Sequence, residues 1–257
     1  MKLEQDYFSI KENTILISIL FLLLLELIGI SDSSLSMTWV SHILIISNIR
    51  RLRGSNDIIY FFRITGYFAH LGLFSLLLKR ISWELNPEKI VVGLLLSLIV
   101  LVVYFYFRKR EFKIIFSKEY ISQISPRKSK SRYFILIYNY LGAAISEELY
   151  FRMLFLELID GHPIVFILVS TTYFMLFHYT LLWSSRFTKS DFINQTIMGI
   201  ALSVIYVISD SIFFPILIHI IINFPNIYLL FRLYCRDFLS PKGFSCEVID
   251  DFKDLEI

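Results

Sequence analysis

Cysteine is scarce in this sequence and does not form a recognisable site. The chain has two cysteines among 257 residues, Cys235 and Cys246, which lie near the C-terminus without the spacing of metal ligands. We therefore expect both thiols to be reduced and structurally minor. The sequence also lacks an HExxH motif, an internal repeat and a low-complexity linker, so neither that zinc motif nor a repeat architecture describes it.

Charged residues are also few, and apolar residues dominate. Only 18% of the residues are charged, whereas 56% are apolar, including 25 Phe and 15 Tyr. Soluble domains average about 45–50% apolar residues, and a mean hydropathy of +0.65 is more than a soluble core of this size can account for. Lipid must therefore cover part of the surface, and the bilayer is the first expected partner. The net charge of +3 is small, and we expect no nucleic-acid partner.

The N-terminal apolar run lacks the features of a signal peptide. Ile15–Ile30 is preceded by few basic residues, Lys2 and Lys11, and no A-x-A cleavage site follows it. We expect this run to be retained as the first transmembrane helix.

A bilayer core about 30 Å thick requires about 20 helical residues, and several apolar runs approach this length. A shorter run, Met37–Ile49, is either a short span or a helix in the membrane interface. The sequence predicts an all-α, polytopic transmembrane helix bundle of about eight spans, forming a single integral membrane domain over residues 1–257. The predicted spans are Thr14–Ile30, Met37–Ile49, Asp57–Leu78, Ile90–Phe107, Tyr138–Ile159, Pro163–Trp183, Phe192–Ser209 and Ile212–Phe231.

The distribution of basic residues favours eight spans over seven. With eight, both termini and the loop Arg108–Arg132 lie on one side, which holds 20 of the 25 Lys and Arg residues. The opposite side holds three, Lys79, Arg80 and Lys89, and the remaining two lie inside spans. By the positive-inside rule the basic side is cytoplasmic, so both termini are expected there. The polar insertion Ser117–Arg132 is expected to be a solvated loop that touches anionic lipid.

Ionisable side chains inside a span are costly, at about 2.5–3.5 kcal/mol for a central charge on the insertion scale, and they normally pair or do chemistry. Three of them, Glu147, Glu148 and Arg152, lie within Tyr138–Ile159. Glu148 and Arg152 are four residues apart, in the favourable order, and are predicted to form an ion pair. Glu147 lies about 100° around the helix axis and has no partner within its own helix. The alternative is that both acids only hold helices together.

Two further spans contain residues spaced four apart that bring polar groups into the bilayer. These are Phe174 with His178, and His219 with Asn223. Taken alone, a histidine in an aromatic span is more often a packing residue, and a His–Asn pair is as often an interhelical hydrogen bond. His178, His219 and Asn223 can donate to an oxyanion, and Glu147 supplies an unpaired carboxylate, so the combination predicts a catalytic site.

The ordered set EExxxR, FxxxH and HxxxN resembles the motifs of the CPBP family, which includes CAAX-protease, bacteriocin-processing and Abi-like membrane peptidases. Each motif alone is weak, but all three occur in order, on separate predicted spans, within residues 142–223, about a third of the chain. The matching residues are Glu147, Glu148 and Arg152, then Phe174 and His178, then His219 and Asn223.

The resemblance implies an eight-helix fold and a glutamate-dependent endopeptidase. Its expected substrate is a peptide or membrane-associated protein, cleaved near the cytoplasmic half of the bilayer. The roles implied by position are Glu147 as general base, His178 as support for the activated water, His219 and Asn223 as oxyanion hole, and Glu148 with Arg152 as the pair that positions the base.

Two histidines and a glutamate also form a possible zinc set, Glu147, His178 and His219, with one open position. Asn223 is a poor zinc ligand but a good oxyanion donor, so a site without metal or other cofactor is favoured over the zinc alternative. One residue departs from the family pattern, because Met153 stands where glycine often follows the motif arginine. A larger side chain there can narrow the helix packing or the substrate groove, so the substrate class stays open.

Three other functions are compatible with a membrane bundle. A transporter or channel would use the polar groups as a relay, but no inverted repeat and no span pair broken by Gly or Pro is present. A non-catalytic bacteriocin-immunity or peptide-binding protein would retain the same fold and residues. A scaffold without a site is disfavoured by the polar cluster. The four alanines and many Ile and Lys residues favour a bacterial cell membrane, and with it a leader-peptide or bacteriocin-related substrate.

Overall fold

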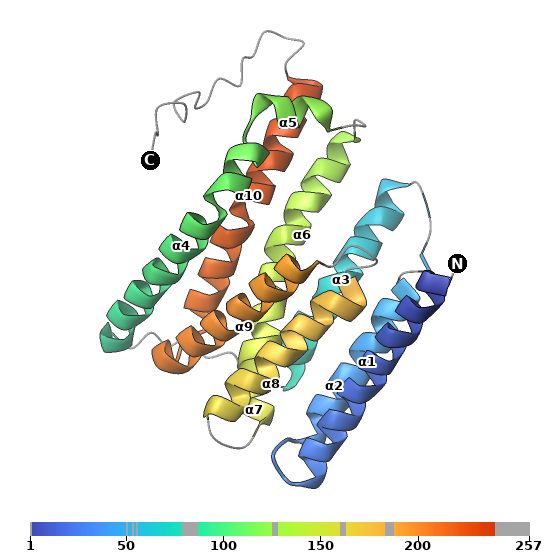
Figure 1. Ribbon diagram of the computed structural model, residues 1–257, viewed down its shortest axis with the longest axis vertical. Coiled ribbons are helices and arrows are strands. Elements are labelled where there is room, and N and C mark those ends of the chain that lie inside the picture. The colour runs from blue at the N-terminus through green and yellow to red at the C-terminus, as the bar shows by residue number, and fades with distance from the viewer. Residues whose placement is uncertain are drawn as a thin grey trace.

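The computed structural model describes residues 2–49, 51–52, 54, 56–78, 87–124, 128–159, 163–182 and 188–239. Over these residues the chain is a bundle of helices that run past one another in alternating directions (Figure 1). The only β-type pairing among them is an isolated bridge between Ser31 and Ile159. The prediction of an all-α bundle is confirmed.

Each predicted span overlaps a described helix, and several helices extend beyond the apolar run by one or more turns. The ambiguous run Met37–Ile49 forms most of a regular helix, and one predicted end, Trp183, lies outside the described residues. The elements are α1 (Lys2–Leu27), α2 (Ser33–Ile49), α3 (Asp57–Leu78), α4 (Pro87–Ile115), α5 (Lys118–Gln123), α6 (Lys130–Glu148), η1 (Leu149–Leu154), α7 (Phe155–Leu158), α8 (Pro163–Leu176), η2 (Phe177–Leu182), α9 (Lys189–Ser209) and α10 (Phe213–Phe238), where η marks a π-helix.

Among the described residues, α3, α4, α9 and α10 are long and apolar enough to cross a membrane, and α8 is a shorter apolar helix. The most apolar part of α4 is only 11% buried inside the protein, and side chains such as Leu95, Leu98 and Val102 point outward. Lipid is the medium that can cover this surface, which makes the chain an integral membrane protein. Whether α1, α2, α6 and α8 also cross, as eight spans require, stays a prediction.

Polar residues cap the helices at their ends. At the start of α6, the Ser129 side chain accepts a hydrogen bond from the backbone of Arg132. Thr188 and Asp191 form a capping box at the start of α9, and Asp210, with φ of 51°, ends that helix in the left-handed conformation. These caps satisfy backbone groups that have no partner within the helix, and they fix where each apolar segment begins or ends.

Two arginines of α10 hold the end of α4 and the short helix α5. Arg232 Nη1 donates to Phe116 O at 2.5 Å, and Arg236 Nη1 donates to Ile124 O at 2.9 Å. These carbonyls lie just beyond the ends of their helices, where no helical N–H is available. The predicted polar loop at 117–132 is therefore partly a helix packed against α10; residues 125–127 lie outside the described part.

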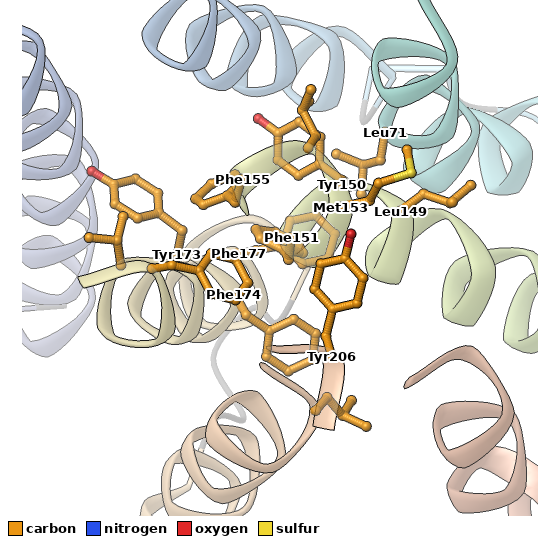
Figure 2. Packing of buried hydrophobic residues seen from close by; sticks show 14 of the residues in the cluster. Leu71, Leu149, Tyr150, Phe151, Met153, Phe155, Tyr173, Phe174, Phe177 and Tyr206 are labelled. Atoms are coloured by element: carbon orange, nitrogen blue, oxygen red, sulfur yellow. The ribbon is translucent and has the colours of Figure 1, made fainter. Parts of the chain in front are cut away.

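The core lies where η1, α8 and η2 meet, and it consists mainly of aromatic side chains. Figure 2 shows Phe151 in the middle of this group, with Phe174 and Phe177 both on one side of it. Its ring centre is 5.5 Å from that of Phe174 and 5.6 Å from that of Phe177, and such pairs add about 0.5–1.5 kcal/mol beyond the area they bury. Because Phe151 directly precedes Arg152 and Phe177 directly precedes His178, the core fixes the backbone at both motifs.

The N-terminal end of α1, the helix α5 and the C-terminal end of α10 lie toward the same end of the bundle (Figure 1). That both termini share one face of the membrane stays a prediction, since residues 240–257 lie outside the described part of the chain. That this face is cytoplasmic stays a prediction from the distribution of Lys and Arg.

Candidate active site

The three ionisable residues of the first motif lie where α6 changes into a π-helix. Glu147 and Glu148 are the last residues of α6, and Arg152 lies in η1. All three side chains are buried, with 3%, 0% and 0% of their surface exposed. π-helical turns are rare and occur frequently at functional sites. Here the wider turn begins directly after the two acids.

Glu148 is held from two sides. Its Oε1 accepts a hydrogen bond from His219 Nδ1 of α10 at 2.7 Å, and its Oε2 lies 3.1 Å from Arg152 Nε. The contact with Arg152 is the ion pair that the spacing of four predicts, although its angles are not those of a hydrogen bond. Glu148 thus faces two cationic or proton-donating partners, which offset the cost of its burial.

The guanidinium of Arg152 has no hydrogen bond within the described part of the chain. Its carbon lies 4.4 Å from the centre of the Phe174 ring, a separation at which the ring face attracts a cation. Phe174 is therefore more than a core residue. It covers the one buried cation beside the two acids, and it belongs to the second motif.

Glu147 is not engaged in this network. Its Oε2 has no hydrogen-bond partner among the described residues and lies 3.7 Å from His178 Nε2, which is too far for a direct hydrogen bond. His178 lies in η2, and its Nδ1–H donates to Phe174 O at 2.9 Å. In the neutral imidazole this bond leaves Nε2 as an acceptor, so an acceptor nitrogen lies across from the carboxylate.

Asn223 lies one turn after His219 on α10, but the two side chains have different partners. Asn223 Nδ2 donates to the backbone oxygen of Tyr140 on α6 at 3.3 Å, whereas His219 donates to Glu148. The structure therefore brings five of the six predicted residues together, whereas Asn223 contacts α6 about two turns before Glu147. It gives His219 a contact with Glu148 that the sequence did not predict.

A second buried polar pair, which the sequence analysis did not single out, joins α2 to α3. His42 Nδ1 is hydrogen-bonded to His70 Nε2, and His70 Nδ1–H donates to Gly66 O at 2.8 Å. The ring of Phe177 lies between this pair and the site, 5.0 Å from the His42 ring and 5.1 Å from that of His178. Ionisable side chains inside a span are costly, and applying this argument to His42 and His70 as it was applied to His178 would have found both histidines.

The zinc alternative can be compared with the positions of the donor side chains. No group of three or more His, Cys, Asp or Glu side chains in the described part of the chain is arranged to hold an ion. The alternative zinc set, Glu147, His178 and His219, is not such a group among these residues, and the bond from His219 Nδ1 to Glu148 does not decide the matter, because a zinc-bound histidine often donates its other ring N–H to a carboxylate. We therefore derive no step through a metal, and independence of metal stays a prediction.

A comparison with protein families identifies the segment that contains this site. Residues 129–225 match the model of the family described as Type II CAAX prenyl endopeptidase Rce1-like. The predicted resemblance is confirmed over these residues. The Rce1-like match begins at the cap of α6 and ends two residues after Asn223, so it includes all six predicted site residues. No curated protein and no solved structure matched the chain.

The Rce1-like segment supports a membrane-embedded endopeptidase that acts on a peptide or protein. It spans less than half of the chain and excludes α1 to α5. The His42–His70 pair therefore belongs to the part that the family comparison leaves undescribed.

We expect Arg152→Ala to lower both the amount of folded protein and the activity. Removing one partner leaves Glu148 buried with an uncompensated charge, which costs about 3–5 kcal/mol. Size-exclusion chromatography of the solubilised protein measures the folded amount. Arg63→Ala is the control, because Arg63 is only half-buried against Tyr60.

The double variant Glu148→Gln/Arg152→Met separates loss of charge balance from loss of shape. It removes both charges together, so the folded amount is expected to recover while activity stays low. A fully folded and active Arg152→Ala protein would show that the ion pair has no part in the site.

Proposed function

We propose that this chain is an intramembrane endopeptidase in which Glu147 is the general base that activates water. One observation supports this most. Of two adjacent buried acids, Glu148 is held by Arg152 and His219, whereas Glu147 Oε2 has no hydrogen bond among the described residues and lies 3.7 Å from His178 Nε2. A carboxylate and an imidazole acceptor facing each other can accept both protons of one water molecule.

The reaction follows from these positions. Glu147 takes a proton from water as the water oxygen attacks the scissile carbonyl, while the other proton is held toward His178. The C–N bond then breaks, and the proton on Glu147 passes to the departing amine. The second proton of the water also ends on the amine, so the products are a carboxylate and an ammonium group, and Glu147 returns to its starting state without a covalent intermediate.

The tetrahedral intermediate needs hydrogen-bond donors for its oxyanion, and we propose His219 and Asn223 for this role. His219 donates Nδ1–H to Glu148, so its Nε2 is a donor only when the ring is an imidazolium. Glu148 is the counter-ion that would hold that state, and Arg152 keeps Glu148 in place. To reach the substrate, Asn223 must first break its hydrogen bond with the Tyr140 carbonyl. Its amide is therefore a donor to the oxyanion only when substrate is present.

We further propose that the substrate is a peptide or membrane-associated protein cleaved near the cytoplasmic half of a bacterial membrane. The basic end of the bundle supports this orientation. The competing function is a non-catalytic bacteriocin-immunity or peptide-binding protein with the same fold, which would use these polar groups to bind a peptide without cleaving it.

Incubation of the purified protein in lipid nanodiscs with a peptide library, followed by mass spectrometry, tests the proposal. We expect cleavage by the wild-type protein and none by Glu147→Gln, because the amide cannot accept the proton of water. Glu157→Gln is the matched control, since Glu157 is an exposed glutamate on α7. Cleavage by Glu147→Gln at the wild-type rate, or protection of cells from a toxic peptide by Glu147→Gln without any cleavage, would refute the enzymatic proposal.

Asn223→Ala separates the metal-free mechanism from the zinc alternative. In the metal-free mechanism this change removes one oxyanion donor and is expected to lower kcat by about 10²–10³ with little effect on folding. Beside a zinc site it would act only indirectly, at about 10–100-fold. We also expect 1,10-phenanthroline to cause no inhibition that added zinc reverses. One zinc per chain by elemental analysis, together with zinc-reversible inhibition, would overturn the metal-free mechanism.

A further inference from the structure

A buried serine of α8 binds the backbone directly next to Arg152. Ser170 Oγ donates to Phe151 O at 2.6 Å, and neither side chain is exposed. Phe151 is the residue before Arg152 in η1. A hydroxyl inside an apolar helix usually bonds to a carbonyl of its own preceding turn. Ser170 instead reaches across to a different element, at the turn from which the buried cation projects.

A second buried serine extends this contact to α9. Ser203 Oγ lies 3.3 Å from Ser170 Oγ and is also fully buried. Because the Ser170 proton is used for Phe151 O, the Ser170 oxygen must accept from Ser203. The bonds therefore run in one direction, from α9 through α8 to η1.

Helices α8 and α9 pack closely beside these two hydroxyls. Gly199 lies one turn before Ser203 on α9, and a Cβ added there would lie 2.9 Å from Thr171 Cγ2 and 3.2 Å from Thr171 Cα. Small residues four apart allow such an approach between membrane helices. The position of α9 relative to α8 is thus fixed at the level of Ser170.

The backbone hydrogen bonding of the π-helix η1 is irregular. At its end, the backbone N–H of Phe155 faces both Arg152 O and Tyr150 O. The guanidinium of Arg152 contacts Glu148 Oε2 and the Phe174 ring, but it has no directional hydrogen bond in the described part of the chain. The place of Arg152 depends on where the backbone of η1 is held, and Ser170 holds it one residue away.

We propose that Ser170 and Ser203 are positioning residues for the Glu148–Arg152–His219 network, an inference that rests on the proposed peptidase function. They hold the wide turn of η1 so that Arg152 lies beside Glu148 Oε2, and Glu148 in turn orients His219. Neither serine touches the substrate. Their effect is on the chemical step, through the oxyanion donor, rather than on substrate binding.

The test compares kcat and KM of Ser170→Ala with those of Ser75→Ala. Ser75 is a matched control, because it is fully buried but donates to Leu71 O of its own helix. Interhelical hydrogen bonds in membranes contribute up to about 1.7 kcal/mol, so we expect kcat to fall about 3- to 20-fold with KM unchanged. Ser203→Ala is expected to have a smaller effect in the same direction, and Ser170→Thr, which keeps the hydroxyl, to restore kcat.

A double-mutant cycle separates positioning from general destabilisation. If Ser170 acts through Arg152, Ser170→Ala adds little to the loss already caused by Arg152→Lys. A merely structural serine would lower the melting temperature and give additive effects on kcat. Additive effects, or a normal kcat in folded Ser170→Ala, would overturn the inference while leaving the peptidase proposal intact.

An NMR measurement keeps the test independent of activity. The His219 Nδ1 proton in its hydrogen bond with Glu148 gives a signal whose shift depends on that bond. We expect Ser170→Ala to move this signal and Ser75→Ala to leave it unchanged. If the wild-type protein cleaves no peptide, the proposed function fails, whereas an unmoved His219 signal in Ser170→Ala would refute the positioning role itself.

Discussion

The structure depends on how the carboxylate of Glu148 is compensated inside the bundle. A charge in a membrane helix is costly, and Glu148 is completely buried beside a second acid. Arg152 from the same helix and His219 from α10 offset this charge together. The contact with His219 ties the first motif to the last one across the bundle, which leaves Glu147 as the acid outside this network. Removing either Arg152 or His219 would leave the charge of Glu148 less well compensated in an apolar environment.

The geometry of this network comes from two widened helical turns and the aromatic core between them. Both η1, which contains Arg152, and η2, which contains His178, begin at or next to a motif residue. Phe174 packs on Phe151 and covers the guanidinium, so the residue that makes the core rigid also shields the cation. The buried hydroxyl of Ser170 on α8 donates a hydrogen bond to the backbone of η1, the first widened turn.

The helices and the Glu148–Arg152 pair could be predicted from local sequence, whereas the contacts between helices could not. Hydropathy placed the helices, and a spacing of four predicted the Glu148–Arg152 pair because both residues lie on one chain segment. The contact between Glu148 and His219 depends on how α6 packs against α10, which spacing within a helix does not determine. The sequence analysis therefore gave His219 a role at the oxyanion, or in the alternative zinc set, but no contact with Glu148. The widened turns were not predicted either, since they change the hydrogen-bonding ring without changing composition, and His42 lay outside the motif pattern that directed attention.

Cleavage of a peptide in water enriched in oxygen-18, followed through a single turnover, tests the proposed mechanism, in which Glu147 delivers water itself to the scissile carbonyl. It predicts one heavy oxygen in the new C-terminal carboxylate of the product from the first turnover, no peptide fragment bound covalently to the protein, and no product from Glu147→Gln. A peptide fragment esterified to a side chain of the enzyme during that turnover, or heavy-oxygen product formed by Glu147→Gln as fast as by the wild-type protein, would contradict it.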